Sequence, residues 1–227
     1  MNDVRELQLT GQVRTHITQI DEPRFAAHPK TVEAFLAMRD AAQKEGIILQ
    51  PFSSFRNLKT QIRIWNKKFR GEKPLYNIHG QERDYHSLDK NEIIDAILGW
   101  SALPGASRHH WGSEIDVVDA AVMPQNYRVQ LLPNEVQSDG IFARLHVWLD
   151  ENMHKFDFFR PYRLHQGGMF PEPWHLSHAP ISIPAQQELS IAMIENVIRN
   201  NHLEGKELLL RRLPQIFRDH INNVCLP

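Results

Sequence analysis

The chain has 227 residues, of which 41% are hydrophobic and 23% charged, so it can bury a core without disulfides or other cross-links. Lysine and arginine number 26 against 27 aspartates and glutamates, and the net charge of -1 gives no general attraction to nucleic acid or to an anionic membrane. The single cysteine, Cys225, excludes an internal disulfide framework and a cysteine-based zinc cluster.

The N-terminal sequence MNDVRELQLTGQVRTHITQ has no basic region followed by an apolar run. We therefore expect no signal peptide and a cytoplasmic location. A periplasmic or wall-associated location is the alternative if the natural protein begins before Met1. No stretch approaches about 18 consecutive apolar residues, so the sequence predicts no membrane span.

Helices and short strands are expected to alternate along the chain. Residues 28–46 predict a helix, with Pro29 in its first turn and Gly46 as its stop. A strand over residues 47–55 and a second helix over residues 58–69 follow. This part of the sequence therefore indicates a mixed fold.

The middle of the chain is more broken. Residues 70–106 are polar and punctuated by glycine and proline, with one short helix expected near 91–100. Residues 107–122 predict a turn at Gly112 and then a strand rich in β-branched residues. Residues 138–156 predict one amphipathic helix.

The last third adds two short strands and a helical tail. The strands are expected at residues 158–162 and 172–178. Residues 185–201 and 205–224 predict helices, the second interrupted by Pro214. We expect these helices to fold back onto the rest of the protein, and an interaction arm is the alternative.

The segment SRHHWGSEID, residues 107–116, gathers two adjacent histidines, a glycine and two acids. Zinc binds imidazole nitrogen and carboxylate oxygen, and a catalytic site keeps one position open. His109 and Asp116 are too far apart for one helical turn, but a chain reversal at Gly112 can bring them onto neighbouring strands. The alternative is a pair of surface histidines beside a turn, with Asp116 as a cap.

The segment EPWH, residues 172–175, offers a third ligand in His175. Glu172 stands three residues earlier, where a carboxylate can accept a proton beside the metal. The 58 residues between Asp116 and His175 follow no spacing rule. From the residues alone, a metal site and a chance arrangement therefore both remain open.

Three segments together resemble the zinc D-alanyl-D-alanine carboxypeptidases and dipeptidases, the family of vancomycin-resistance peptidases and L,D-carboxypeptidases, which is related in structure to lysostaphin and hedgehog-type domains. SRHHWGSEID resembles the motif Ser-x-His-x-x-Gly-x-Ala-x-Asp, with Glu114 at the position of the small residue. EPWH is similar to the second motif, and SSFRNLKTQ (53–61) resembles Ser-Gly-Tyr-Arg-Ser-x-x-x-Gln, with three departures. The resemblance covers about residues 30 to 178.

The resemblance implies one zinc ion held by His109, Asp116 and His175. It implies that Glu172 is the general base, which later passes its proton to the leaving amine. Arg56 would hold either the developing oxyanion or the substrate carboxylate, since arginine stays charged and offers a fork of donors.

Three further residues are implied to contact or shape the substrate pocket. Ser107 and Gln61 would contact the terminal residue of the substrate, and Trp174 would form the pocket wall. Their competing roles are a turn cap for Ser107, an exposed helix position for Gln61 and core packing for Trp174. His110 is not expected to be a ligand.

We therefore expect an α+β fold in which a small antiparallel sheet carries the zinc site, flanked by helices. The expected division is a catalytic domain over residues 1–180 and a helical extension over residues 181–227. The implied function is removal of a terminal D-alanine from peptidoglycan-derived peptides, with no nucleic-acid or membrane partner. The alternatives are L,D-carboxypeptidase or dipeptidase activity, an endopeptidase of stem peptides, and a zinc-containing binding module without catalysis.

Overall fold

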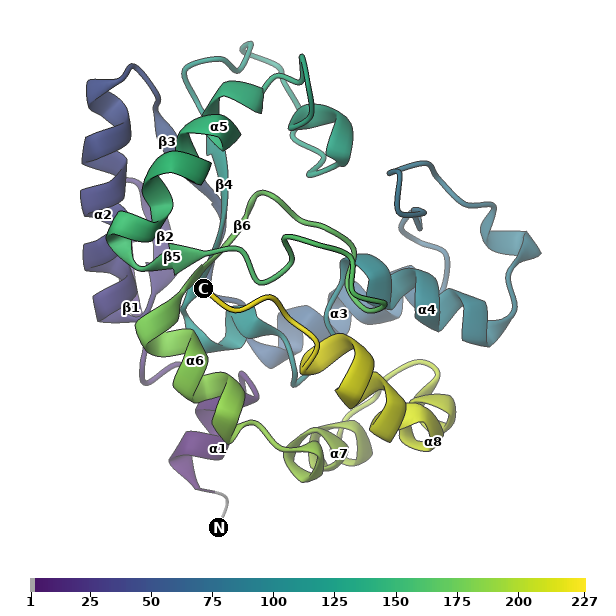
Figure 1. Ribbon diagram of the computed structural model, residues 1–227. Coiled ribbons are helices and arrows are strands. Elements are labelled where there is room, and N and C mark those ends of the chain that lie inside the picture. The colour runs from purple at the N-terminus through teal and green to yellow at the C-terminus, as the bar shows by residue number, and fades with distance from the viewer. Residues whose placement is uncertain (1–2) are drawn as a thin grey trace.

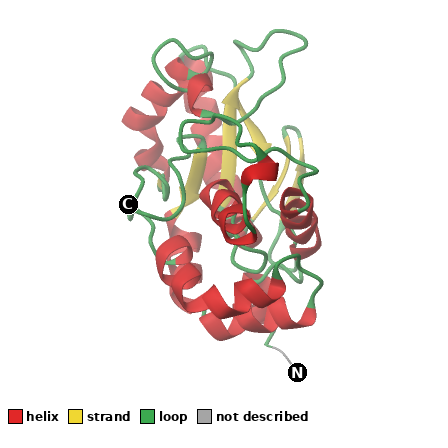
Figure 2. Ribbon diagram, turned by 90° about the vertical axis from the view of Figure 1, so that its right-hand side faces the viewer, coloured by secondary structure: helices red, strands yellow, loops and turns green. Residues whose placement is uncertain are grey.

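The computed structural model describes residues 3–227, in which helices surround a four-stranded antiparallel sheet (Figure 1 and Figure 2). This confirms the predicted α+β class with a small antiparallel sheet and C-terminal helices. In spatial order the strands are β3 (Leu49–Ser53), β4 (Glu114–Asp119), β6 (His175–His178) and β5 (Phe158–Phe159).

Strand β4 lies between β3 and β6 in the sheet, and all six of its residues are buried. It pairs antiparallel with β3 on one side and with β6 on the other. The register places Asp116 opposite His175 on β6 and opposite Ser53 on β3. Strands β3 and β6, which are distant in sequence, therefore flank Asp116 on its two sides.

A two-stranded hairpin, β1 (Thr18–Asp21) with β2 (Arg24–Ala27), was not predicted from the sequence. Each strand has only four residues, and three of the four in β1 are exposed. Such a strand lacks the alternation of polar and apolar residues that would reveal it.

The helices begin mostly at side chains that cap their free N–H groups. Asn57 accepts from the N–H of Thr60, and Asp89 and Glu92 form a capping box. The helices are α1 (Val4–Leu9), α2 (Pro29–Lys44), α3 (Leu58–Phe69), α4 (Lys90–Trp100), α5 (Ala143–Asn152), α6 (Ala179–Glu188), α7 (Ile191–Asn200) and α8 (Lys206–Ile216).

Three predicted helices differ from the observed ones. The helix expected over 138–156 is shorter, because turns occupy the residues before α5 and a 3₁₀ turn follows it. The stretch 185–201 is split between α6 and α7, and α6 begins earlier than expected. Pro214 lies inside α8 without ending it, and one π-helical turn, Phe217–Ile221, follows.

Among residues 3–227 the buried hydrophobic side chains form two large clusters and a small one around Val118 and Trp174. One large cluster joins α2, the sheet and α5 through residues such as Phe35, Ile115 and Leu145. The other large cluster joins α3 and α4 to the C-terminal helices and includes Trp65 of α3 and Leu209 of α8. Figure 1 shows α7 and α8 beside this helical half. The C-terminal helices are therefore packed on the protein, while the domain division at residue 180 stays a prediction.

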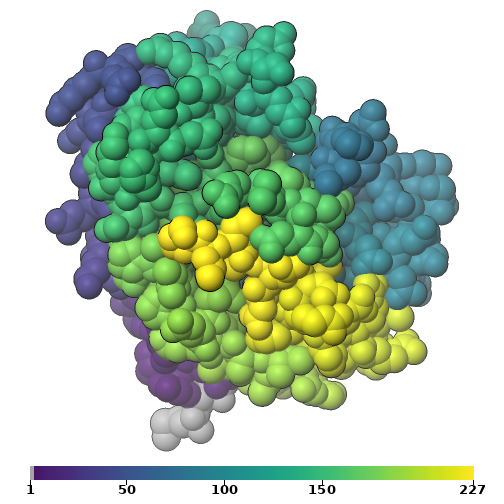
Figure 3. Space-filling model, in the orientation of Figure 1, coloured from purple at the N-terminus to yellow at the C-terminus, as the bar shows by residue number. Residues whose placement is uncertain are grey.

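The end of the chain returns to the loop that follows β5. The N–H of Cys225 donates to the carbonyl oxygen of Pro161 at 2.8 Å, and the side chain of Asn223 donates to the carbonyl oxygen of Gln166 at 2.6 Å. Figure 3 shows this yellow segment lying against green residues on the surface. In the described part of the chain, no helix is long and apolar enough to cross a membrane.

The packing predicts that the C-terminal helices contribute to global stability. Leu209→Ala removes a fully buried side chain from the shared core and should lower the free energy of unfolding by about 2–5 kcal/mol. Leu226→Ala, at a position 72% exposed, is the control and should change it by less than about 0.5 kcal/mol. Chemical denaturation measures both. Equal small effects, or a separate early transition for the tail, would contradict shared packing.

Candidate metal centre

His109 lies on a short 3₁₀ helix, Arg108–Trp111, and not on a strand as expected. Gly112 ends this helix in the left-handed conformation, with φ 71°. A Cβ at Gly112 would lie 2.7 Å from the backbone nitrogen of His28, which cannot move aside as a side chain can, so glycine is required at this turn. The predicted reversal at Gly112 is thus present, and β4 begins two residues later.

The three predicted ligands meet in a buried cluster. Their candidate ligand atoms all lie within 4.8 Å of one another. Nε2 of His109 is 3.4 Å from Oδ2 of Asp116, and Nδ1 of His175 is 2.9 Å from Oδ1 of Asp116. Two imidazole nitrogens and one carboxylate are a donor set that suits zinc and leaves a fourth position for a reactant.

Both imidazole rings are oriented by contacts on the side away from Asp116. Nδ1 of His109 must carry a proton, because it lies 2.8 Å from the carbonyl oxygen of Ser54, which can only accept. Nε2 of His175 lies 2.8 Å from Oε2 of Glu114. These contacts leave Nε2 of His109 and Nδ1 of His175 facing the cluster, as a metal site requires.

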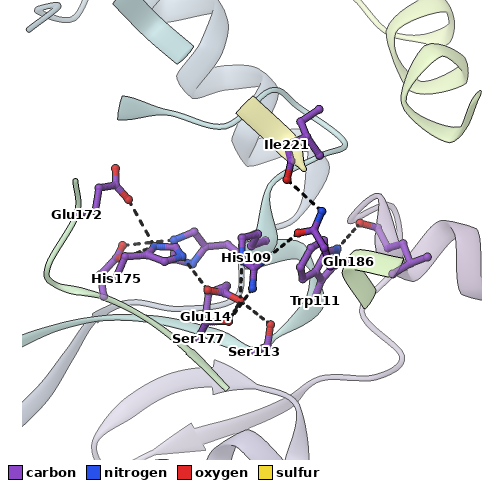
Figure 4. Close-up of polar contacts among 12 residues, drawn as sticks. His109, Trp111, Ser113, Glu114, Glu172, His175, Ser177, Gln186 and Ile221 are labelled. Carbon is purple, nitrogen blue, oxygen red and sulfur yellow. Dashed lines mark hydrogen bonds and ion pairs between the residues drawn. The ribbon is translucent and has the colours of Figure 1, made fainter. Parts of the chain in front are cut away.

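Glu172 enters the cluster through a β-turn. The N–H of His175 donates to the carbonyl oxygen of Glu172 at 3.0 Å, and Pro173 occupies the second position, where its fixed φ suits the turn. Oε2 of Glu172 consequently lies 3.6 Å from Nδ1 of His175 (Figure 4). Burial raises the pKa of Glu172 to about 8, although His175 opposes this shift. Its carboxyl group is therefore suited to exchange a proton near neutral pH.

Arg56 faces the same pocket and is held at both ends of its guanidinium. Nη1 donates to Oε1 of Gln61 and Nη2 to Oγ of Ser53, each at 2.9 Å. The amide of Gln61 also donates to the carbonyl oxygen of Ala102 at 2.8 Å, and its side chain is fully buried. The alternative of an exposed helix position for Gln61 is therefore wrong. Gln61 orients Arg56, and its contact with substrate stays a prediction.

His110 supports Arg56 and is not part of the ligand cluster. Its Nδ1–H donates to the carbonyl oxygen of Arg56 at 2.6 Å, and its Nε2 accepts from the N–H of Gly105 at 3.2 Å. A ring that donates at one nitrogen and accepts at the other is neutral. Burial accordingly lowers the pKa of His110 to about 3.

Ser107 and Trp174 both line the pocket that contains the cluster. Ser107 precedes the 3₁₀ helix, but its hydroxyl makes no capping hydrogen bond. Trp174 is buried and stacks on Trp100 with ring centroids 6.1 Å apart, so it also packs in the core. Their roles toward substrate stay predictions.

Lys68 is a pocket residue that the sequence analysis missed. Its Nζ donates to Oγ of Ser101 at 2.7 Å, and burial lowers its pKa to about 8. Lys68 lies seven residues after Gln61 on α3, and this spacing, two helical turns, would have placed both on one face. Neither Lys68 nor Arg56 forms an ion pair with a carboxylate of residues 3–227.

Comparison with known proteins then identifies the family. The family model for VanY, D-alanyl-D-alanine carboxypeptidase, matches residues 24–181, well over half of the chain. The chain belongs to the D-alanyl-D-alanine carboxypeptidase family. Membership supports a peptidoglycan peptidase, which is a hydrolase.

Two known proteins illustrate the sequence similarity of this chain to its relatives. An uncharacterised protein of Haemophilus influenzae is 35% identical over 121 residues, 52% of this chain and 92% of that protein. A D-alanyl-D-alanine carboxypeptidase of Enterococcus faecalis is 26% identical over 148 residues, 63% of this chain and 44% of that protein.

Two solved structures share the fold of this family member. VanYB in complex with D-alanine-D-alanine has a TM-score of 0.55 and 19% identity, with 84% of this chain and 92% of that chain covered. A mutant of the vancomycin-resistance D,D-pentapeptidase VanY in complex with Zn(II) also has a TM-score of 0.55, with 22% identity and coverage of 78% and 84%.

The cluster predicts that metal binding competes with protons. Burial would lower the pKa of His175, but contacts with Asp116 and Glu114 outweigh it and raise the value to about 10. In the metal-free protein His175 is therefore protonated at neutral pH, and zinc must displace that proton. Zinc affinity should rise between about pH 6 and 9, with proton release, in calorimetry using buffers of different ionisation heat. Affinity independent of pH, without proton release, would contradict this.

Proposed function

We propose that this protein is a zinc-dependent carboxypeptidase that releases terminal D-alanine from peptidoglycan-derived peptides. The observation that carries the proposal is the buried cluster of His109, Asp116 and His175, with the carboxyl group of Glu172 at its edge. The family membership supports it, and so do relatives in complex with Zn(II) and with D-alanine-D-alanine.

In this proposal His109, Asp116 and His175 hold the metal. Their one carboxylate cancels only one of the two charges of Zn²⁺. A zinc ion there supplies Lewis acidity, which makes water a competent nucleophile near neutral pH and polarises a carbonyl group.

Glu172 performs the proton transfers. Its carboxylate accepts a proton from water as the water oxygen bonds to the peptide carbon. The same proton then passes to the amine nitrogen as the carbon–nitrogen bond breaks, so that D-alanine leaves as a neutral amine group with its carboxylate. A pKa raised by burial favours this exchange because it brings the carboxyl group near the working pH.

Arg56 and Lys68, the two cations of the pocket that form no ion pair with a carboxylate of residues 3–227, divide the remaining tasks. Arg56, fixed by Ser53 and Gln61, is oriented to stabilise the oxyanion that develops on the carbonyl oxygen. Lys68, held by Ser101, is then available for the terminal carboxylate of the substrate. A pocket with two cations that lack acidic partners favours a substrate with a free carboxylate at the residue that leaves.

The side chains that line this pocket weigh against the alternative functions. An endopeptidase substrate continues beyond the cut bond and has no carboxylate beside it for Lys68. A binding module without catalysis would not require both Glu172 and Arg56 in one pocket with the cluster. The choice between D,D- and L,D-linked bonds depends on the residue before the cut bond. In this proposal Ser107 contacts the terminal residue of the substrate, and Trp174 forms the pocket wall.

The general base is tested by Glu172→Gln. This change removes the proton acceptor and should lower turnover by about 10²–10⁴-fold, while the three proposed ligands keep zinc. Release of D-alanine from D,D- and L,D-terminated muropeptides measures turnover, and metal analysis measures zinc content. Unchanged turnover would show that another group is the base, and loss of zinc would make Glu172 a ligand. No D-alanine release by the zinc-loaded natural protein would refute the substrate assignment.

The carboxylate role of Lys68 is tested by Lys68→Met. Loss of a charged hydrogen bond should raise KM for a peptide with a free terminal carboxylate by about 10- to 100-fold. The C-terminally amidated peptide should be cleaved as slowly by the variant as by the natural protein. Lys67→Met, on the same helix but outside the site pocket, is the matched control. Equal effects on both peptides would refute the assignment.

A further inference from the structure

A further carboxylate, that of Glu114, lies behind the cluster of His109, Asp116 and His175. It occupies the position at which the motif Ser-x-His-x-x-Gly-x-Ala-x-Asp has a small residue. Glu114 on β4 is fully buried and faces Ser177 on β6. Its Oε1 accepts from Oγ of Ser113 and from Oγ of Ser177, each at 2.8 Å. Its Oε2 lies 2.8 Å from Nε2 of His175 (Figure 4). Glu114 therefore contacts the ring nitrogen of His175 that points away from Asp116.

A buried arginine compensates this carboxylate. Nε of Arg108 lies 3.3 Å from Oε1 of Glu114, and Nη2 donates to Oγ of Ser177 at 2.7 Å. The guanidinium also lies 4.8 Å above the ring of Trp111. A carboxylate that has lost its water needs such a partner, because an unpaired buried charge is strongly destabilising. Arg108 thus fixes the position of Glu114.

The third member of the network comes from the C-terminal helices. Nη1 of Arg108 donates to Oε1 of Gln186 on α6 at 2.6 Å. The amide of Gln186 in turn donates to the carbonyl oxygen of Ile221 and to Oδ1 of Asn222, both at 3.0 Å. A continuous line of polar contacts consequently runs from Ile221 through Gln186, Arg108 and Glu114 to His175. Figure 4 labels Ile221, Gln186, Glu114 and His175 along this line.

We infer that Glu114 is a positioning residue for His175, and that Arg108 and Gln186 connect this role to the C-terminal helices. An imidazole can rotate about its bond to Cβ, and only one orientation directs Nδ1 toward Asp116. The carboxylate of Glu114 at Nε2 selects that orientation before any metal arrives, and it retains the proton on Nε2 when Nδ1 gives up its proton to bind the metal. The C-terminal helices are then required for metal affinity as well as for packing. This inference rests on the proposed zinc site.

The first test is the zinc affinity of Glu114→Gln. The amide keeps the shape of the side chain but removes the charge that faces Nε2 of His175. Affinity should fall by about 10- to 100-fold in competition with a chromophoric chelator, once the proton released on binding is accounted for from the pH dependence of each protein. An affinity within twofold of the natural protein would refute the inference.

The second test remains decisive if Glu114→Gln does not fold. Gln186→Glu keeps an oxygen acceptor for Arg108 but loses the donors to Ile221 and Asn222. Gln186→Met loses both. If Gln186 acts on the metal site through Arg108, zinc affinity should fall severalfold in Gln186→Met and stay near the natural value in Gln186→Glu. If Gln186 only docks the end of the chain, both variants should behave alike, and the inference is refuted.

The readouts separate this inference from the proposed reaction. Zinc affinity is measured without substrate, and the thermal stability of each metal-free variant shows whether the fold has changed. A natural protein that binds zinc tightly but releases no D-alanine would refute the proposed reaction and leave the positioning role standing. Normal D-alanine release by the natural protein, with unchanged zinc affinity in Glu114→Gln, would refute the positioning role and leave the proposed reaction standing.

Discussion

The register between β4 and β6 is the constraint on which the rest of the site depends. Side chains alternate between the faces of a strand, so Glu114 and Asp116 point to one side while Ile115 lies between them on the other. On β6 the same alternation places His175 and Ser177 on the polar side. The opposite face packs into the core with α2 and α5, so a slip of one residue would bury carboxylates in that core. Hydrophobic packing on one face thereby keeps the candidate metal ligands on the other face.

The polar face buries several charges and arranges them in compensated groups. Glu114 is paired with Arg108, and Asp116 lies between the imidazoles of His109 and His175. Glu172 is less compensated, which is why burial raises its pKa. Arg56 and Lys68, which form no ion pair with a carboxylate of residues 3–227, face the pocket. In the proposed reaction the compensated charges hold the metal ligands in position, and the two uncompensated cations face the oxyanion and the terminal carboxylate of the substrate.

The sequence predicted the parts of this arrangement that local spacing encodes. The turn at Gly112, the offset between Glu172 and His175, and helix α2 follow from short-range patterns, and the structure contains all three. The β1–β2 hairpin and the split after α6 were missed because their local patterns are short. The contact of Arg108 with Gln186 joins residues 78 apart, and no spacing rule predicts it. Glu114 was visible only as a departure from a motif, and its role became evident from the groups that surround it.

Anomalous diffraction at the zinc absorption edge, from crystals of the zinc-loaded protein, tests the central claim most directly. We predict one zinc site per chain, bound by Nε2 of His109, Nδ1 of His175 and a carboxylate oxygen of Asp116, at about 2.0–2.2 Å. Glu114 should remain beside Nε2 of His175, outside the coordination sphere. Zinc bound through Nε2 of His175, zinc ligated by Glu114, or no zinc at this cluster would contradict the account.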